Sequence, residues 1–256
     1  MKITLLGCGT SVGVPSLGAL GWGKCNPNNP KNRRQRSSVL IQNNGYNILI
    51  DAGPDVRNQL LETKINKIDA VLITHTHADH VSGLPELRPY FFTERKKIPI
   101  YGQKNSLNEI NKMFDYLFEK NSNSPSYFIP PMTLSEINEG KLDLFDFNLN
   151  VFIQDHGNIN TLGFKFNNKF AYSTDVVRMP NSNFKILENL DLWIVDALRE
   201  HPHETHAHFD LTFEWINKIN PKKSILTHLG HVDYDYILSI CPENVYPGYD
   251  GMEFYL

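Results

Sequence analysis

One short segment, Ala70–Gly83, constrains this chain more than any other part of its sequence. It reads AVLITHTHADHVSG, in which an apolar run is followed by three histidines and an aspartate within six positions. A short apolar run that stops at polar residues is typical of a buried strand, and a strand end attaches metal-binding side chains rigidly. Neutral imidazoles with a carboxylate suit Zn²⁺, Mn²⁺ or Fe²⁺ better than Ca²⁺ or Mg²⁺. The segment therefore predicts a transition-metal site, formed by His75, His77, Asp79 and His80.

Three more candidate ligands lie far along the chain, each at the point where another apolar run stops. They are His156, Asp175 and His228. Layered α/β folds place ligands at the ends of neighbouring strands along one edge of a sheet. Any one of the three could simply cap a turn, but together they complete two coordination shells. We therefore predict that they join the first four residues.

Strands are expected before helices in both halves of the chain, which favours a layered α/β architecture. The polar segment Asn121–Pro131 is expected to be a loop. We do not interpret it as a linker because candidate ligands lie on both sides of it, and we expect a single domain over residues 1–256. Apolar runs predict strands at Ile3–Leu6, Val39–Ile41, Ile48–Ile50, Ala70–Ile73, Ile98–Tyr101, Val151–Ile153, Leu162–Phe166, Phe170–Tyr172, Leu192–Val195 and Ser224–Leu226. Helical periodicity is found at Asp55–Glu62, Leu107–Phe118, Phe184–Leu190, Leu211–Ile219 and Tyr234–Ile240.

Composition excludes several classes of function. The net charge of −3 gives no electrostatic basis for binding long nucleic acids. The three cysteines, Cys8, Cys25 and Cys241, have no spacing typical of a disulfide framework. The first apolar run is too short for a signal peptide, and no later run could span a membrane. We therefore expect a cytoplasmic protein without a membrane partner.

The sequence resembles the metallo-β-lactamase superfamily, whose HxHxDH signature is present as His75–His80. Within that superfamily it is most similar to the phosphoribosyl cyclic phosphodiesterases, and more distantly to tRNase Z. The resemblance implies a four-layer αββα sandwich. The motifs that carry it, besides the signature, are Gly7–Pro15, Asn32–Ser38, Asp51–Gly53, Ser173–Asp175, His208–Leu211, Leu226–His228 with His231, and Gly248–Met252.

The resemblance also implies how the ligands divide between two divalent ions, zinc or manganese. His75, His77 and His156 would hold one ion. Asp79, His80 and His228 would hold the other, and Asp175 would bridge them. Two such ions 3.5–4 Å apart can share a hydroxide that attacks a phosphoryl group.

A proton donor for the leaving oxygen is expected among the histidines of residues 201–208. A histidine suits this task because it titrates near neutral pH. His208 matches the cyclic phosphodiesterases through its HxDL context, so the resemblance implies that His208 is the general acid. Asp196, at the end of the preceding strand, could orient it, as an acidic residue does in tRNase Z.

Two features depart from, or are not explained by, the family pattern. Cyclic phosphodiesterases carry clustered cysteines and a later histidine for a structural zinc, but only Cys25 and His231 stand here. Two ligands do not make a closed zinc site, so we expect none. The one basic run of the chain, Lys31–Arg36, is either a solvated loop or a segment whose guanidinium groups attract a phosphate group. The sequence leaves these two alternatives open.

The leading hypothesis is a phosphodiesterase that opens a small cyclic ribose phosphate or a similar phosphodiester. A tRNase Z-like endonuclease is disfavoured, because fewer than twenty residues separate His156 from Asp175, where tRNase Z carries its arm. A thioesterase or lactonase with the same ligands stays an alternative. A non-catalytic carrier is disfavoured by the complete ligand set. The sequence leaves a homodimer open.

Overall fold

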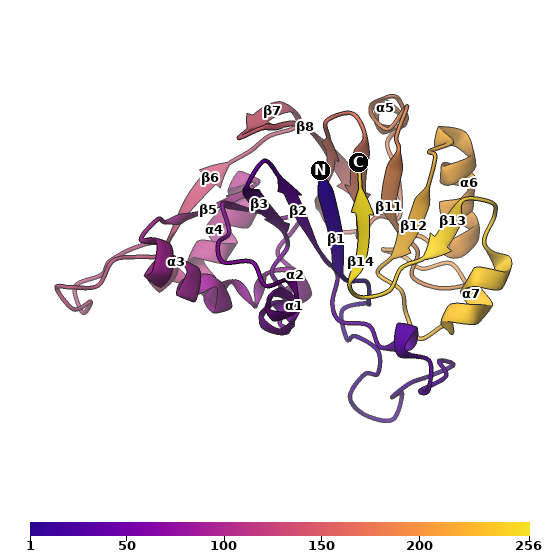
Figure 1. Ribbon diagram of the computed structural model, residues 1–256, viewed down its shortest axis with the longest axis horizontal. Helices are drawn as coiled ribbons and strands as arrows, with labels where there is room; N and C mark the ends of the chain where they lie inside the picture. Colours follow the sequence, from indigo (N-terminus) through magenta and orange to yellow (C-terminus); the bar gives the residue numbers. More distant parts are fainter.

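The computed structural model describes residues 1–256, and its framework is two mixed sheets packed face to face, with helices on both outer faces (Figure 1). The predicted four-layer αββα sandwich is confirmed. The first sheet runs, in spatial order, β14 (Met252–Tyr255), β1 (Lys2–Gly7), β2 (Ser38–Asn43), β3 (Tyr46–Ile50), β4 (Ala70–Leu72), β5 (Ile98–Gly102) and β6 (Met132–Glu136). The second runs β13 (Val245–Pro247), β12 (Ser224–Thr227), β11 (Leu192–Asp196), β10 (Phe170–Ser173), β9 (Asn160–Phe166), β8 (Phe147–Asp155) and β7 (Gly140–Leu144).

Three apolar clusters hold the four layers together. The middle cluster contains 22 buried residues drawn from both sheets, from Ile3 to Ile225. The other two, with 18 buried residues each, pack the helices onto the outer faces. Burial of apolar surface is the main favourable term in folding, so the middle cluster holds the two halves of the chain together. Our expectation that all 256 residues form one domain stays a prediction.

The helices agree with the periodicity in four of the five predicted places. The exception is Phe184–Leu190, because the helix there begins and ends earlier, at Asn181–Ile186. Pro180 precedes its first turn, and Asn189 has a left-handed φ of 60°, which a continuing helix does not allow. The helices are α1 (Val56–Thr63), α2 (Ala78–Val81), α3 (Arg88–Glu94), α4 (Lys104–Met113), α5 (Asn181–Ile186), α6 (Phe209–Ile219) and α7 (Tyr234–Ile240), with short 3₁₀ turns η1 (Pro30–Asn32), η2 (Leu84–Leu87) and η3 (Asp115–Leu117).

The strand directions bring distant residues to one edge of the second sheet. Strands β10, β11 and β12 are parallel, and β8 points the same way because two antiparallel pairings separate it from β10. Their carboxyl ends therefore lie along one edge. Side chains that directly follow these strands meet there, although up to 72 positions separate them in sequence, from His156 to His228. This arrangement creates the site described below.

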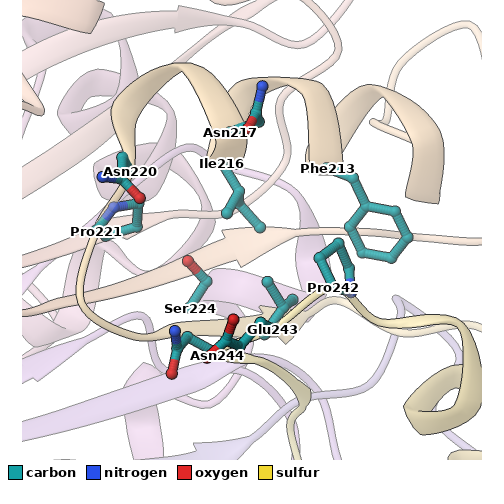
Figure 2. A pocket seen from close by; sticks show the side chains of 10 residues that line it. Phe213, Ile216, Asn217, Asn220, Pro221, Ser224, Pro242, Glu243 and Asn244 are labelled. Atoms are coloured by element: carbon teal, nitrogen blue, oxygen red, sulfur yellow. The ribbon is translucent and has the colours of Figure 1, made fainter.

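A pocket of about 360 Å³ opens at the opposite end of β12. It lies between α6 and the segment 242–245, with Phe213 and Ile216 on the helix side and Ser224 beneath them (Figure 2). Because it is at the amino ends of β12 and β13, it is separate from the edge that carries His228. No helix in the structure combines the length and apolar character needed to cross a membrane.

Candidate metal centre

Four strand ends and one short helix bring the predicted ligands together. His75 lies just beyond β4, and Asp79 and His80 lie on α2, for which His77 is the N-cap residue. The remaining ligands follow the second sheet: His156 after β8, Asp175 after β10 and His228 after β12. Six of the seven side chains are buried and His77 is exposed. The structure thus gathers all seven predicted ligands in one place.

The seven side chains form two groups of possible metal-ligating atoms. One contains His75, His77, His156 and Asp175, and the other contains Asp79, His80 and His228. Within each group the ligand atoms lie within 4.8 Å of one another. This is the division that the resemblance implied.

Asp175 is the carboxylate that faces both groups. Its Oδ1 is 3.8 Å from the Nε2 of His75, 3.7 Å from that of His156 and 3.6 Å from that of His228. Its Oδ2 is 3.3 Å from the Nε2 of His80. A carboxylate with oxygens toward both groups has the geometry needed to bridge two ions.

The buried ring nitrogens at the centre fit a metal. The Nε2 atoms of His75, His80 and His228 are buried and have no hydrogen-bond partner in the protein. Leaving buried polar atoms without partners is costly, and native proteins rarely do it without a reason. Three such nitrogens converging on carboxylates match the donor set of a zinc or manganese site.

The other ring nitrogen is held by the protein in two of the buried histidine ligands, His80 and His156. His80 Nδ1 is 2.7 Å from Oδ2 of Asp51, which is fully buried and also accepts hydrogen bonds from the backbone and hydroxyl of Thr74. His156 Nδ1 donates to the carbonyl of Thr205 at 2.6 Å. Such partners fix the ring orientation and the tautomer of a metal ligand. Asp51, for which the sequence gave us no role, is therefore a positioning residue for His80.

Gly53 explains why the Asp51–Gly53 motif accompanies the signature. A Cβ at this position would lie 2.0 Å from the backbone oxygen of Asp79. Only glycine allows the chain after β3 to approach α2 this closely. The motif thus holds Asp51 and the ligand helix against each other.

Three residues of the centre adopt a left-handed backbone that non-glycine residues rarely use. The φ angles are 61° for Asp51, 53° for Asp175 and 54° for His228. Such strained conformations persist only where the surrounding structure enforces them, and they cluster at functional sites. Two of the three are predicted ligands and the third supports a ligand.

The charged groups at the centre shift one another's pKa values. Burial raises the pKa of Asp175, but the nearby imidazoles of His228 and His80 outweigh burial and hold that pKa well below its usual value. Burial lowers the pKa of His228, but the carboxylates of Asp175, Asp79 and Asp196 outweigh it and raise the pKa to about 9. The pKa of His80 is raised in the same way. Without a metal, these histidines carry protons that balance the buried carboxylates.

Metal affinity should therefore rise with pH up to about 9. A histidine must lose its proton before it can bind a metal, and the raised pKa of His228 means that this proton is still bound at neutral pH. Each displaced proton contributes about tenfold in affinity per pH unit. Competition with a chromophoric chelator at pH 6.5, 7.5 and 8.5 measures the slope. His203→Gln, which changes a histidine outside both groups, should leave the slope unchanged. Affinity that does not vary with pH would show that His228 is already neutral.

His206 is the histidine that reaches the centre, not His208. His206 Nδ1 lies 2.9 Å from Oδ2 of Asp196, and its Nε2 lies 3.8 Å from Oδ1 of Asp175. His208 is instead the N-cap residue of α6: its carbonyl accepts a hydrogen bond from Thr212, and its side chain makes none. The chain turns into the helix directly after His208, which places this side chain outside the pocket. The HxDL context thus coincides with the start of a helix. The general-acid role of His208 stays a prediction, and the structure places His206 in its stead beside Asp196 and Asp175.

Asp196 lies where the sequence suggested, but its partner is different. It ends β11, is fully buried and accepts a hydrogen bond from the backbone of Val176 at 2.9 Å. With its carboxylate fixed in this way, Asp196 can hold the ring of His206 in one orientation. The position of His206 three residues before a helix and ten after a strand-ending aspartate was the available signal in the sequence.

The basic run Lys31–Arg36 agrees only in part with the solvated loop that the sequence left open, because Lys31 and Arg33 are exposed whereas Arg34 is buried and Arg36 is partly buried. Arg34 is buried and donates to the carbonyls of Gly230 and Val232 at 2.6 and 2.9 Å. Arg36 pairs with Asp55 at 3.1 Å. The other two cations lie over aromatic rings, Lys31 over Tyr234 and Tyr249 and Arg33 over Trp22. None of the four lines the metal pocket.

Cys25 and His231 belong to no group of three metal-ligating atoms. Cys25 is buried, and the guanidinium of Arg34 is 3.9 Å from its sulfur. Through its bonds to the segment 230–232, Arg34 joins the loop after β1 to the segment after β12. A buried guanidinium therefore ties together the two segments that a structural zinc would join.

The pocket above the centre holds about 240 Å³. Besides ligands and His206, it is lined by residues that the sequence did not indicate: Ser11, Asn158, Ile159 and Thr205. These come from three separate loops. A space of this size accommodates a small molecule.

Comparison with known proteins agrees with this geometry. The sequence profile described as "Beta-lactamase superfamily domain" matches residues 46–229, which include all seven predicted ligands. This chain belongs to the metallo-β-lactamase superfamily. It has candidate metal-binding residues within that fold. A crystal structure of a diphosphatase from the PhnP family shares 30% identity with it and superposes with a TM-score of 0.89, covering 99% of this chain and 96% of that one. The predicted superfamily and its PhnP-like relationship are confirmed.

Two curated relatives show how far sequence similarity extends. An octanoyltransferase of Porphyromonas gingivalis is 33% identical over 260 residues, covering 99% of this chain but 51% of that protein. A ribonuclease Z of Bradyrhizobium sp. is 27% identical over 141 residues, covering 54% of this chain and 46% of that protein. The chain thus spans about half the length of these curated relatives.

Proposed function

We propose that this protein is a dinuclear metal-dependent phosphodiesterase that acts on a small phosphodiester, such as a cyclic ribose phosphate. The observation that carries this proposal is the single cluster formed by seven metal-ligating side chains and the His206–Asp196 pair. The ligands would hold two zinc or manganese ions, with His75, His77 and His156 on one ion, Asp79, His80 and His228 on the other, and Asp175 between them.

The chain's own residues would divide the remaining work. When bound, a pair of divalent ions lowers the pKa of a water molecule and withdraws charge from a phosphoryl oxygen. Asp196 holds the Nδ1–H of His206, so that Nε2 points into the pocket and can deliver a proton to the leaving oxygen. Asp51 and the Thr205 carbonyl keep the ligand rings in place.

A small substrate is favoured over RNA by three observations. Between His156 and Asp175 the chain forms only β9, β10 and their turns, which leaves no arm for gripping tRNA. The cations of the Lys31–Arg36 run are occupied by other partners and lie outside the metal pocket. The net charge is −3, whereas RNA binding relies on many contacts between phosphates and positive side chains.

A diphosphatase reaction is the second candidate, because the structurally similar diphosphatase is 30% identical across nearly the whole chain. The chemistry at phosphorus would be the same, but a phosphate would leave in place of an alcohol. A phosphate leaving group needs little protonation, so His206 would contribute less to that reaction. The dependence on His206 therefore separates the two candidates.

Octanoyl transfer gains no support from this site. The relative with that name is about twice as long as the part that matches this chain. Acyl transfer through a covalent intermediate needs an activated serine, cysteine, threonine or lysine. No cysteine or lysine lines the metal pocket, and Ser11, which does, has no hydrogen bond to a base. Thr205 is the lining hydroxyl that lies beside a base, 3.2 Å from Nδ1 of His203, and that histidine does not line the pocket.

We expect the metal-loaded protein to hydrolyse bis(p-nitrophenyl) phosphate and a cyclic ribose phosphate, with kcat/KM for the cyclic ester at least about tenfold above that for a nucleoside diphosphate sugar. A tenfold preference corresponds to about 1.4 kcal/mol of differential transition-state binding. Phosphorus NMR identifies the products, and Asp175→Ala protein purified in parallel controls for contaminating phosphatases. Faster cleavage of the diphosphate would favour the second candidate. Accurate 3′-end cleavage of a tRNA precursor would overturn both in favour of a nuclease.

A further inference from the structure

Next to the metal pocket lies another pocket, of about 370 Å³, which we call the second pocket and whose wall contains apolar side chains. Its walls include Val12 and Leu20 from the loop after β1, Leu198 from the segment after β11, and Val232 from the segment after β12. Leu198 and Val232 are buried, whereas Val12 and Leu20 are 52% and 57% exposed. Exposed apolar side chains that face a concave surface are typical of a binding site.

The charged residues around this second pocket have partners within the protein. Lys24 forms an ion pair with Glu200 at 3.1 Å. The guanidinium of Arg199 keeps its charge but donates to the carbonyls of His201 and Pro202, in its own loop. The apolar walls of the pocket favour an uncharged, apolar group.

Two segments of the chain contribute neighbouring residues to the second pocket and to the proposed active site. Ser11 lines the metal pocket, and its neighbours Thr10 and Val12 line the second one. His228 is in the metal pocket, and Gly230, two residues later, is in the second. Hydrogen bonds between these segments hold their relative positions, with the Gly230 N–H donating to the Leu198 carbonyl at 2.9 Å.

We infer that the second pocket is a specificity subsite, which binds an uncharged ring-bearing ester group of the substrate while the phosphate lies at the metal centre. This inference rests on the proposed function, because it places the phosphate of that reaction at the metals. It names the substrate class more closely: a phosphodiester with one apolar ring, such as a nucleobase or another aromatic group. The known similarity to other hydrolases does not supply this assignment.

The test uses phosphate monoesters, because each carries a single organic group. Calorimetry on the metal-loaded protein would compare methyl phosphate, benzyl phosphate and 2-carboxyethyl phosphate. We expect benzyl phosphate to bind about tenfold more tightly than methyl phosphate, an effect that burial of roughly 60 Å² of ring surface supplies. The carboxyethyl ester should show no such gain.

Two variants test whether the tighter binding of benzyl phosphate arises at the second pocket. Val12→Ser combined with Leu20→Ser, and separately Leu20→Asp, should bring the benzyl-to-methyl ratio close to one. Both positions are exposed, so neither variant removes core packing. Leu17→Ser is the matched control: Leu17 is in the same loop, is 99% exposed and does not line the pocket, so the ratio should stay near ten.

The outcomes separate this inference from the proposed function. If bis(p-nitrophenyl) phosphate is hydrolysed but the native ratio is near one, the subsite assignment fails and the phosphodiesterase stands. A tenfold ratio that persists in both pocket variants also overturns the assignment. If no phosphodiester is hydrolysed, the proposed function fails and the subsite assignment falls with it.

Discussion

Replacing Asp175 with alanine is expected to release metal and abolish hydrolysis together. Asp175 is the carboxylate that faces both groups of ligands, with its Oδ1 3.6 to 3.8 Å from three histidines and its Oδ2 3.3 Å from a fourth. Its removal would take one ligand from each of the two proposed ions and leave buried imidazoles without their counter-charge. Loss of a residue that merely supports a ligand costs about 10–100-fold in metal affinity. For this ligand we expect a loss of at least about 100-fold.

Metal content after dialysis, measured by plasma mass spectrometry, and turnover of bis(p-nitrophenyl) phosphate check this expectation. Asp69→Ala is the matched control, since Asp69 is also a buried aspartate but pairs with Lys67 and the Asn47 backbone, apart from both metal groups. That variant should lose stability while keeping its metal. Retention of two ions per chain by Asp175→Ala would contradict a bridging role. Two ions in the native protein and fewer in the variant would support it.

Replacing His206 with alanine is expected to lower kcat for a cyclic ribose phosphate by about 10²–10⁴, the usual cost of losing a general acid. Metal content should be unchanged, because the other seven side chains complete both groups. The loss should shrink for esters whose leaving group is already acidic, such as p-nitrophenyl esters, since these need little protonation. Steady-state kinetics on both substrates measures the two losses in kcat, and metal analysis of the same samples measures the metal content.

His208→Ala is the control for this experiment, because His208 is two residues away but caps α6 outside the pocket. Its kcat should stay within about tenfold of the native value, below the usual cost of losing a general acid. One result would change the assignment of His206, because Asp175, His206 and His228 also form a group that could hold a metal. If His206→Ala loses an ion, His206 is a ligand and not a proton donor. If His208→Ala shows the larger rate loss, the motif-based assignment was right.

The sequence determined the framework of the site because its signals are local. Four of the predicted ligands, His75, His156, Asp175 and His228, come shortly after short apolar runs, and such runs are typical of buried strands. Parallel strands then bring their carboxyl ends to one edge of a sheet. His156, Asp175 and His228 could thus be predicted as partners of the HxHxDH segment, and the structure brings them together. The layered α/β architecture could be predicted for the same reason, whereas its four-layer form was implied by the resemblance to the metallo-β-lactamase superfamily.

The sequence alone could not determine which side chain of a loop enters the pocket. His201, His203, His206 and His208 lie within eight residues that have no regular structure, so no periodicity assigns their directions. The orientation of His206 depends on Asp196, ten residues earlier, and on the residue at which α6 begins. Helix ends are among the least reliable features to predict from sequence, because the capping geometry is set by tertiary contacts.

Tertiary structure also decided the roles of buried charges. Arg34 and Arg36 lie in one basic run, yet Arg34 is buried against carbonyls some 200 residues away and Arg36 pairs with Asp55. Asp51 belongs to a recognisable motif, but only the fold places its carboxylate on His80. A charged side chain is buried only where specific partners compensate its desolvation. Those partners come from other strands and loops, so the local sequence determined the ligands and their strands, whereas the three-dimensional fold decided which polar groups support them.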